Sequence, residues 1–362
     1  MNLKKPVPTP EKALLLLTLL LSVVGLLFVF EASVAEAFAR FGNQFYFVRQ
    51  QALWLIVGLV GLIAGVIVPS QVWKKSAPLL YGLSIFLLLL VFVPGIGFEV
   101  NGARRWIGFL GFSFQPVELV KFAMICFFAS WMEKHQKLGP FLFLTLIPVG
   151  LLFLQPDMGS ALITLAIAFG LYFLAGAPLK TFLFTGVAGV LCLILLVVTS
   201  PYRYQRVTTF LNPESDPLGA SFHIRQITIA LGNGGLFGQG IGKSRQKFSY
   251  IPEASTDSIF AIVAEEVGFL GSLLVFASFA LYLRLAYKIV QKTVEGSYEH
   301  LLAAGIMIWI GMQIVLNLAS IVALVPLTGV PLPFFSYGGT ALVMVLSITG
   351  ILIGIGRRHS RV

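Results

Sequence analysis

The sequence predicts an all-α, polytopic integral membrane protein, and two observations carry that prediction. Of the 362 residues, 57% are hydrophobic and only 11% are charged, whereas roughly a quarter of the residues in a soluble domain are charged. Uncharged apolar segments long enough to cross a membrane also recur along the whole chain. This composition excludes a soluble domain, a disordered chain and a disulfide scaffold.

Ten of these segments are predicted to be transmembrane helices, because a backbone in lipid must satisfy its own hydrogen bonds. They are residues 13–31, 51–69, 77–94, 117–132, 141–155, 158–176, 181–199, 258–283, 301–323 and 340–356. The first segment is longer than the apolar region of a secretory signal, so we expect it to be retained.

The distribution of Lys and Arg predicts the orientation. With the N-terminus inside, the inner segments hold 14 of these residues and the outer segments hold 10, six of them in one long loop. We therefore expect both termini to be cytoplasmic. The net charge of +10 then fits contact with anionic lipid headgroups and argues against nucleic acid as a partner. Cys126 and Cys192 lie in apolar runs and indicate no disulfide or metal site.

We expect one domain, residues 1–362, whose only sizeable polar region is an outer loop at about 200–257. Residues 218–231 of this loop are able to form an amphipathic surface helix. A glycine-rich stretch follows at 231–244, LGNGGLFGQGIGKS. It lacks the first glycine of a P-loop and follows no strand, which excludes nucleotide binding.

Basic residues on the outer side suit a phosphorylated ligand. Clustered glycines let backbone N–H groups approach an anion, and Arg presents a fork that matches phosphate oxygens. The candidate anion-binding residues are Arg105, Arg203, Arg206, Lys243 and Lys247. Ordinary contact with headgroups is the alternative.

Carboxylates near the membrane are costly and are therefore candidates for function. Glu118, Asp157 and Asp257 all fall at the outer ends of predicted helices. Each has a structural alternative: Glu118 can pair with Lys121 three residues on, and Asp157 and Asp257 can cap helices. Asp257 is the candidate general base, because partial burial raises the pKa of a carboxyl toward neutrality. Glu265 and Glu266 are predicted to be partners in helix packing.

The last outer loop, residues 324–339 (LVPLTGVPLPFFSYGG), is rich in Pro and Gly and almost uncharged. Irregular backbone at this depth persists only where it packs against protein or lines a cavity. Asn317, in the preceding predicted helix, is placed to satisfy part of it.

Several motifs together resemble the SEDS family of bacterial cell-wall polymerases (FtsW, RodA and SpoVE), and the FtsW type most. They cover about residues 14–356: NGARRWI (101–107), QPVELVK (115–121), QPDMGSA (155–161), RYQRVTTFLNPESDPLG (203–219), LGNGGLFGQGIGKSRQKFSYIPEASTD (231–257), FAIVAEEVG (260–268) and GVPLPFFSYGG (329–339).

The resemblance implies the SEDS fold and a peptidoglycan glycosyltransferase in the bacterial cytoplasmic (inner) membrane. Such a protein polymerises lipid II, a disaccharide linked to undecaprenyl pyrophosphate, into glycan strands at the outer face. The family's essential acid falls on Asp257, and its basic and acidic motif residues fall on Arg105, Glu118 and Lys121. Septal synthesis in cell division is the expected process, with a class B penicillin-binding protein and other divisome membrane proteins as partners.

The implied chemistry needs few groups. A base activates the acceptor's 4-hydroxyl, and a single inversion needs no covalent nucleophile. Arg and Lys, or a divalent cation such as Mg or Mn, would stabilise the leaving pyrophosphate, and no organic cofactor is expected. We expect the lipid substrates to enter sideways between helices.

Two positions depart from the family pattern. Ser255 stands where a His is expected, and Thr340 where a Ser is expected. Ser255 removes a possible neighbour of Asp257 and weakens any prediction about how its pKa is tuned. A lipid II flippase and a non-catalytic divisome scaffold are the alternative functions.

Overall fold

The computed structural model describes residues 9–100, 102–109, 112–214, 219, 221–248 and 251–360. Along the chain the elements are α1 (Pro10–Phe41), α2 (Tyr46–Ile67), α3 (Ser70–Leu90), β1 (Gly97–Val100), β2 (Ala103–Phe109), β3 (Phe112–Phe114), α4 (Pro116–Met132), α5 (Leu138–Leu154), α6 (Met158–Leu174), α7 (Leu179–Val198), α8 (Pro201–Leu211), α9 (Phe222–Gly234), α10 (Ile259–Val290), α11 (Tyr298–Ile321) and α12 (Gly339–His359). Some residues used in the sequence analysis lie outside the described ranges: Lys4, Lys5 and Arg361, which were counted in the distribution of Lys and Arg, Asn101 of NGARRWI, and residues 215–218, 220, 249 and 250 of the outer loop.

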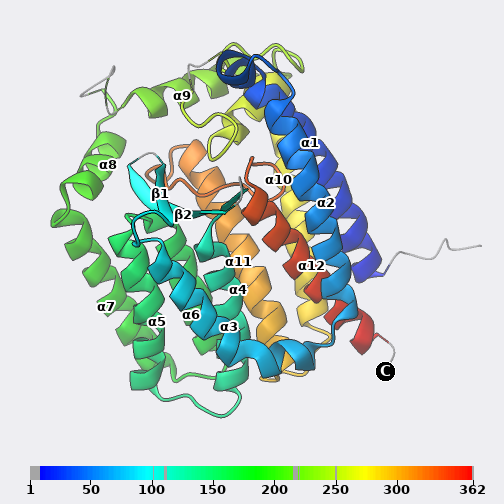
Figure 1. Ribbon diagram of the computed structural model, residues 1–362, viewed down its shortest axis with the longest axis vertical. Helices are drawn as coiled ribbons and strands as arrows, with labels where there is room; N and C mark the ends of the chain where they lie inside the picture. The colour runs from blue at the N-terminus through cyan, green and yellow to red at the C-terminus, as the bar shows by residue number, and fades with distance from the viewer. Residues whose placement is uncertain are drawn as a thin grey trace, which may run out of the picture.

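Each of the ten predicted segments contains a helix in the described part of the chain (Figure 1). Seven of these helices are long and apolar enough to cross a membrane. The other three, α4, α5 and α6, have 17 residues each, which is at the short end of the spanning range. The chain is thus a multi-pass helical membrane protein, and ten spans remain a prediction.

The expectation of an all-α fold is corrected by a small sheet. β1 and β2 form an antiparallel hairpin, and β3 pairs with the other edge of β2. Asn101-Gly102 is a typical hairpin signal, and Gly102 adopts a φ of 75°. Strands of three to seven residues show little periodicity in a sequence, so the segment between the predicted helices at 77–94 and 117–132 gave no clear strand signal.

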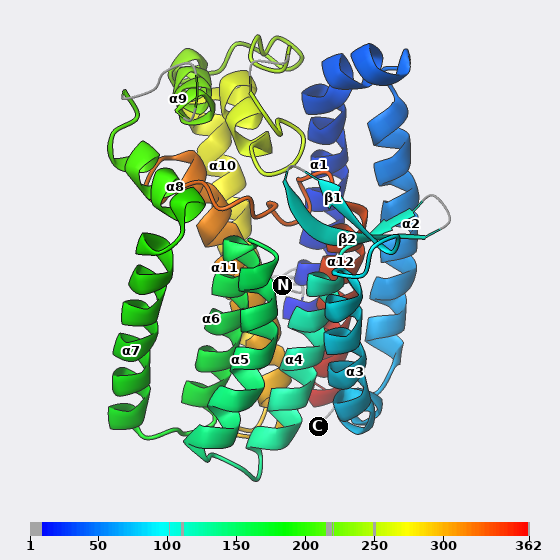
Figure 2. The same ribbon diagram turned by 60° about the vertical axis from the view of Figure 1, so that its left-hand side comes forward.

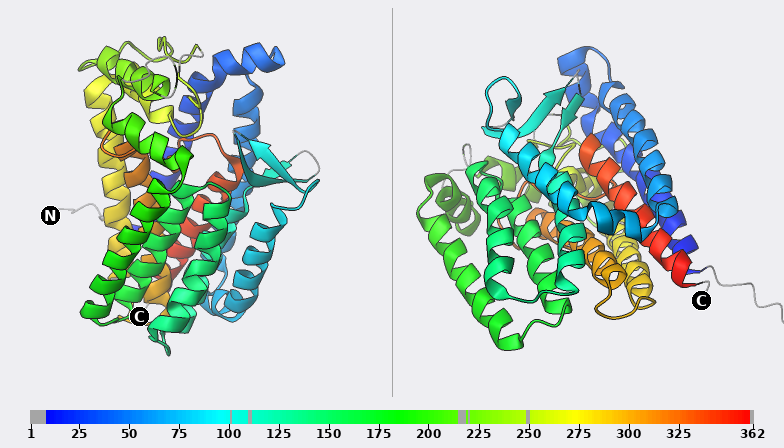
Figure 3. Two further views of the ribbon diagram at one scale, coloured as in Figure 1. Left: turned by 90° about the vertical axis from the view of Figure 1, so that its left-hand side faces the viewer. Right: turned by 60° about the horizontal axis from the view of Figure 1, so that its bottom comes forward.

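The long outer loop contains two helices rather than one. The predicted surface helix at 218–231 corresponds to α9, which begins at Phe222. α8 was not predicted, although Pro201 at its first position favours a helix start. Figures 2 and 3 show α8, α9 and the sheet gathered toward one end of the bundle.

Small residues allow α2 and α12 to pack closely. A Cβ on Gly350 would overlap the backbone of Leu62, and one on Gly65 would overlap the backbone near Ser347 and Ile351. Close approach through small residues is the usual way for helices to associate in lipid. α12 has buried residues along its whole length, as do α4 and α11, so these three helices form the centre of the bundle.

α7 lies at the margin of the bundle (Figures 1 and 2). Thr185 is the one residue of this helix that is buried. Its Leu, Val and Phe side chains are largely exposed, as expected for a helix that faces lipid on most sides.

The backbone of α10 is not helical at Gly268. The glycine-rich stretch at 231–244 forms hydrogen bonds with the carbonyl oxygens just before this position. Gly268 has φ 68° and ψ −168°, which is not helical and is accessible essentially to glycine. Backbone N–H groups of Gln239 and Gly240 donate to the carbonyl oxygens of Glu265 and Glu266, at 3.0 Å each. In this structure the glycine-rich stretch therefore pairs with helix backbone, a role that the sequence analysis did not anticipate.

A polar cluster joins the two described ends of the chain. Lys292 Nζ lies 2.5 Å from Glu11 Oε1, and Ser360 Oγ donates to the same carboxylate at 3.3 Å. The start of α1 and the ends of α10 and α12 therefore meet at one end of the bundle. α10 and α12 begin at the opposite end, where the candidate site lies.

Candidate functional site

Asp257 lies immediately before α10 and is held there by its neighbours. Asn317 Nδ2, in α11, donates to the Asp257 carbonyl oxygen at 2.7 Å. Thr256 Oγ1 lies 3.4 Å from Asp257 Oδ1 and donates to Glu253 Oε2 at 2.7 Å. The expected alternative of Asp257 as a helix cap is wrong, because Ser258 occupies the cap position.

The environment of Asp257 favours its protonated form. The residue keeps partial contact with a cavity, but protein surrounds its carboxyl group. Burial is the main cause that raises its pKa to about 7, and the nearby negative charge of Glu253 raises it further; Arg206 acts in the opposite direction. A carboxyl group that ionises near neutral pH is suited to general base catalysis.

A cavity of about 580 Å³ opens beside Asp257. Six of the nine sequence-predicted site residues line it: Arg105, Glu118, Lys121, Asp157, Arg206 and Asp257. These residues come from β2, α4, the N-cap position of α6, α8 and the segment before α10. The tertiary fold thus brings together charged groups that are distant in sequence.

Glu118 and Lys121 form a buried ion pair in α4, as their spacing predicted. Lys121 Nζ donates to Glu118 Oε1 at 2.7 Å, and both side chains are at most 2% exposed. The Lys121 ammonium also lies 4.8 Å from the centre of the Trp309 ring. Glu118 Oε2 has no hydrogen-bond partner within the described ranges, so it remains able to accept a bond from water or ligand.

Arg105 is fixed over the corner between α5 and α6. Its Nε donates to the Gln155 carbonyl oxygen at 3.2 Å, and its Nη2 donates to the Pro156 carbonyl oxygen. Asp157 Oδ2 lies 4.0 Å from Arg105 Nε. Asp157 also caps α6 through Ser160 N at 3.1 Å. The capping alternative for Asp157 is therefore confirmed, and it coexists with a position at the cavity.

The two arginines of α8 differ in position. Arg206 lines the cavity and donates from Nη1 to the Leu327 carbonyl oxygen at 2.9 Å. Arg203 does not line it: its Nη2 donates to the Phe153 carbonyl oxygen at 2.9 Å and its guanidinium lies over the Phe153 ring. The position of Arg203 indicates that it ties α8 to α5.

The two lysines of the glycine-rich region do not line the cavity. Lys247 is 5% exposed and lies between Glu31 Oε2 at 2.9 Å and Glu266 Oε1 at 3.3 Å. Lys243 is exposed on the surface. Glu265 accepts from Ser244 Oγ and from Gln246 N. Lys247, Glu265 and Glu266 thus anchor the glycine-rich stretch to α10, which confirms the packing role predicted for the two glutamates.

The last outer loop behaves as expected. Leu332, Phe334 and Phe335 are buried, and residues 329–331 and 337–339 line the cavity. Asn317 Nδ2 donates to the Val330 carbonyl oxygen at 2.8 Å. The loop therefore combines packing against protein with lining of the cavity.

Sequence reasoning missed four aromatic residues and one histidine at the cavity. Trp54, Phe98, Trp106 and Tyr337 line one part of it, and His223 of α9 lines the part near Asp257. His223 Nε2 lies 2.7 Å from Ser258 Oγ. Burial lowers the pKa of His223 to about 4, so its imidazole is neutral at physiological pH. The WI pair of NGARRWI was a possible signal for Trp106; His223 had none, because it stands alone in the sequence.

The described residues do not form a metal site of their own. Within the described ranges, no three His, Cys, Asp or Glu side chains converge to hold an ion. Mg²⁺ is commonly bound by one or two carboxylates together with substrate phosphates, so the expected Mg or Mn stays a prediction.

These features define a multi-pass helical membrane protein with a charged, partly aromatic cavity at one end of its bundle. The chain belongs to the FtsW/RodA/SpoVE family of cell cycle proteins, whose family model matches residues 11–361. It is 38% identical to Stage V sporulation protein E of Bacillus subtilis, over 96% of this chain and 97% of that protein. It is 39% identical to a protein of Geobacter sp. named "Probable peptidoglycan glycosyltransferase FtsW", over 96% of this chain and 97% of that one.

Two solved structures have the same fold. A chain of a complex described as "Structural coordination of polymerization and crosslinking by a peptidoglycan synthase complex" is 29% identical, with a TM-score of 0.79 over 97% of this chain and 98% of that chain. The Rod shape determining protein RodA of Thermus thermophilus is 28% identical, with a TM-score of 0.70 over 96% of each chain.

Proposed function

We propose that this protein is a peptidoglycan glycosyltransferase that polymerises lipid II into glycan strands, with Asp257 as the general base. The observation that carries the proposal is the position of Asp257, a carboxyl group with a pKa of about 7, in one cavity with Arg105, Lys121 and Arg206. The names of the FtsW relatives support the same activity.

The reaction follows from these positions. Ionised Asp257 takes the proton of the acceptor's 4-hydroxyl, and that oxygen attacks the anomeric carbon of the donor. The bond from this carbon to the diphosphate breaks, and the leaving diphosphate keeps the electron pair. The cationic side chains of the cavity stabilise the charge that develops. One displacement inverts the anomeric carbon, so one base is sufficient.

The aromatic residues suit a sugar substrate. Trp54, Phe98, Trp106 and Tyr337 come from α2, β1, β2 and the last outer loop, and we call them the aromatic wall. Aromatic rings offer flat apolar faces that match the C–H faces of a pyranose. Gly339 lies against the Trp54 ring, where a Cβ would overlap it, so Trp54 is held in place.

The same proposal includes ten transmembrane helices, cytoplasmic termini and a site at the outer face of the bacterial cytoplasmic membrane. The bias of Lys and Arg supports this orientation, and both described ends lie opposite the cavity.

The small number of buried residues in α7 supports sideways entry of lipid substrates between helices. A role in septal synthesis, with a class B penicillin-binding protein as partner, is supported by the FtsW relatives and by the complex that contains a related chain.

Polymerisation by purified protein tests the proposal. The protein, alone and with a class B penicillin-binding protein, is given lipid II in detergent or vesicles, and glycan chains are resolved on a gel. We expect chains from wild type and a loss of about 100-fold or more with Asp257→Asn, the scale of removing a general base. Glu295→Gln, an exposed carboxylate outside the cavity, is the control and should polymerise normally.

Other results identify the alternatives. Chains made normally by Asp257→Asn would show that Asp257 is not the base. Headgroup translocation across vesicles without any chains would indicate a flippase. Binding to the penicillin-binding protein without either activity would indicate a scaffold.

A further inference from the structure

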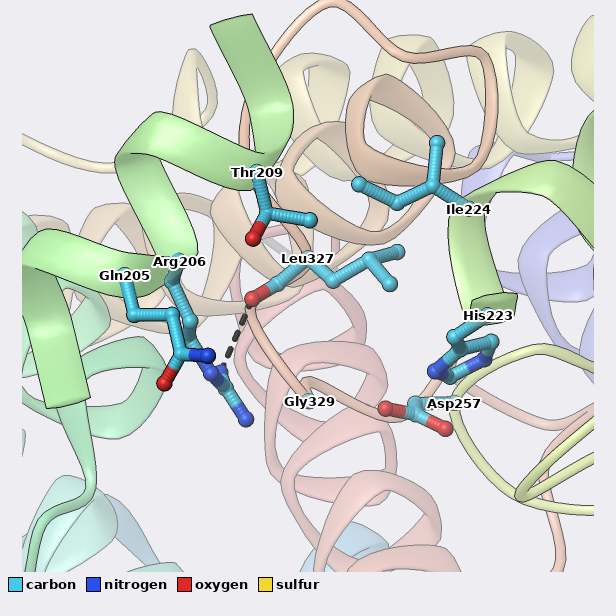
Figure 4. Close-up of a pocket in the computed structure, with 8 residues that line it drawn as sticks. All are labelled: Gln205, Arg206, Thr209, His223, Ile224, Asp257, Leu327 and Gly329. Atoms are coloured by element: carbon cyan, nitrogen blue, oxygen red, sulfur yellow. Dashed lines mark hydrogen bonds between the residues drawn. The ribbon is translucent and has the colours of Figure 1, made fainter. Parts of the chain in front are cut away.

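A second, smaller cavity of about 360 Å³ is also lined by Asp257 (Figure 4). Gln205, Arg206 and Thr209 of α8 face it from one side, and His223 and Ile224 of α9 from another. Leu327 and Gly329 of the last outer loop complete the lining. We call it the α8–α9 cavity, and the cavity of about 580 Å³ the main cavity.

The two cavities meet at Asp257. Arg206, His223, Asp257 and Gly329 line both of them. Gly329 has a φ of 70°, and a Cβ at this position would lie 3.7 Å from Asp257 Oδ2. A larger side chain there would stand beside the carboxylate at the junction. Glycine at this position readily adopts the positive φ, and the absence of a side chain keeps Asp257 accessible from both cavities.

The two cavities differ in charge. The charged groups that line the main cavity alone are Arg105, Lys121, Glu118, Asp157 and Glu253. Among its described lining residues, the α8–α9 cavity has two charged groups, Arg206 and Asp257, both of which it shares with the main cavity. Its other lining residues are Gln205, Thr209, His223, Ile224, Leu327 and Gly329. Burial lowers the pKa of His223 to about 4; the negative charge of Glu253 opposes this, and the positive charge of Arg206 lowers the pKa by a smaller amount. This cavity therefore presents neutral hydrogen-bonding groups, which suit hydroxyl groups better than a diphosphate.

His223 is held rigidly at the junction. Its Nε2 lies 2.7 Å from Ser258 Oγ. Ser258 is the N-cap residue of α10, but its side chain makes no capping hydrogen bond. A serine at this position usually stabilises a helix through such a bond. Here the hydroxyl instead bonds the imidazole that faces both cavities.

We propose that the α8–α9 cavity is the acceptor subsite, which holds an uncharged sugar ring with its attacking hydroxyl at Asp257, while the main cavity holds the sugar and diphosphate of the donor. The inference rests on the proposed function. A displacement with inversion needs the nucleophile and the leaving group on opposite sides of the reacting carbon. Two cavities that meet at the base provide that arrangement: the proton passes to Asp257, the new C–O bond forms at the junction, and the diphosphate leaves into the main cavity, where Arg105 and Lys121 lie.

Thr209→Phe tests the assignment, because it fills the α8–α9 cavity from α8. Thr209 is 8% exposed and lines this cavity but not the main one. Thr208→Phe is the matched control: Thr208 lines neither cavity, and its hydroxyl bonds the Tyr204 carbonyl oxygen of its own helix. The two variants add the same ring to adjacent positions of α8.

Donor and acceptor are separated with a lipid II analogue that lacks the 4-hydroxyl and so acts as donor only. An analogue that keeps the 4-hydroxyl but has a non-leaving group in place of the diphosphate serves as acceptor only, and the first coupled product is measured while each partner is varied. For Thr209→Phe we expect the KM for the acceptor to rise about tenfold or more, which corresponds to about 1.4 kcal/mol, while the KM for the donor analogue changes less than about twofold. Thr208→Phe should resemble wild type. Equal effects on both substrates, or an effect on the donor alone, would overturn the assignment.

A measurement on wild type covers the case in which Thr209→Phe does not fold. The free disaccharide without lipid or diphosphate should inhibit competitively against the acceptor and not against the donor analogue; competition with the donor alone, or no inhibition, overturns the assignment. If wild type forms no coupled product, the proposed function itself fails. If wild type couples the substrates but the cavity variant matches its control, only the acceptor subsite fails.

Discussion

The side-chain amide of Asn317 donates to the backbone carbonyl oxygen of Asp257 at 2.7 Å and to that of Val330 at 2.8 Å. One buried nitrogen in α11 therefore ties together the segment that carries the candidate base and the loop that lines both cavities. Asn317 has no exposed surface, so neither bond is exchanged with bulk water. The position of Asp257 thus depends on a residue that does not itself line the cavity.

Asn317→Ala should slow polymerisation by up to about 100-fold, because a displacement of about 1 Å at a catalytic group has effects of that size. The two carbonyl oxygens would also lose a buried donor, at a cost of about 1–3 kcal/mol each. Initial rates and thermal unfolding are measured together. Ser320→Ala is the control, since Ser320 Oγ bonds only the Asn317 carbonyl oxygen of its own helix. Normal rates from Asn317→Ala would show that Asp257 is positioned without it.

The pH dependence of the reaction should follow the ionisation of Asp257. Because the base must be ionised and its pKa is raised to about 7, kcat/KM should rise with pH and level off above about pH 7. Glu253→Gln removes a negative charge that raises this pKa, so the rise should move to lower pH. Rate profiles of wild type, Glu253→Gln and the distant Glu295→Gln measure the shift. An unchanged or upward-shifted profile for Glu253→Gln would contradict the electrostatic explanation.

Trp106 should contribute to substrate binding through its ring. Trp106→Ala is expected to raise the KM for lipid II about three- to tenfold, in line with roughly 1 kcal/mol for an aromatic contact. Trp106→Phe keeps a flat face and should recover most of the affinity. Both constants are obtained from initial rates over a range of lipid II concentrations. A KM that is equal for the Ala and Phe variants would argue against contact between the aromatic wall and the sugar.

The two lysines predicted to bind substrate should behave differently from each other. Lys247→Ala leaves Glu31 and Glu266 without their shared cation, and breaking a buried ion pair in this way costs about 3–5 kcal/mol. We expect a marked fall in the unfolding temperature. Lys243→Ala, at an exposed position outside both cavities, should change neither stability nor polymerisation appreciably. A lower affinity for lipid II in stable Lys243→Ala protein would restore its predicted binding role.

Many of the site residues could be predicted from the sequence, because charged residues are rare in membrane helices and therefore stand out as candidates. Glu118 and Lys121 could be paired from their spacing alone, and the structure places them 2.7 Å apart. The placement of Asp157 at the corner before α6 likewise predicted its capping bond. These are local relationships, which helix geometry fixes within one or two turns.

Relationships between distant segments were not visible. Lys247 and Arg206 are both basic residues of the long outer loop, and the sequence gives no reason to distinguish them. In the structure Lys247 lies between Glu31 and Glu266, whereas Arg206 lines both cavities. The glycines of 231–244 suggested an anion site, but they allow that stretch to pair with the broken backbone of α10. His223 reaches Ser258 from 35 residues away, a contact that no periodicity encodes.

The sequence by itself determined the membrane environment, the positions of the helices and the residues whose charge demands an explanation, because lipid penalises every exposed polar group and leaves few patterns possible. Only the tertiary structure decided which of those charges face a cavity, which neutralise one another inside the bundle, and that two cavities meet at Asp257. Those outcomes depend on how α8, α9 and the last outer loop pack over the bundle, and packing between distant segments leaves no local trace in the chain.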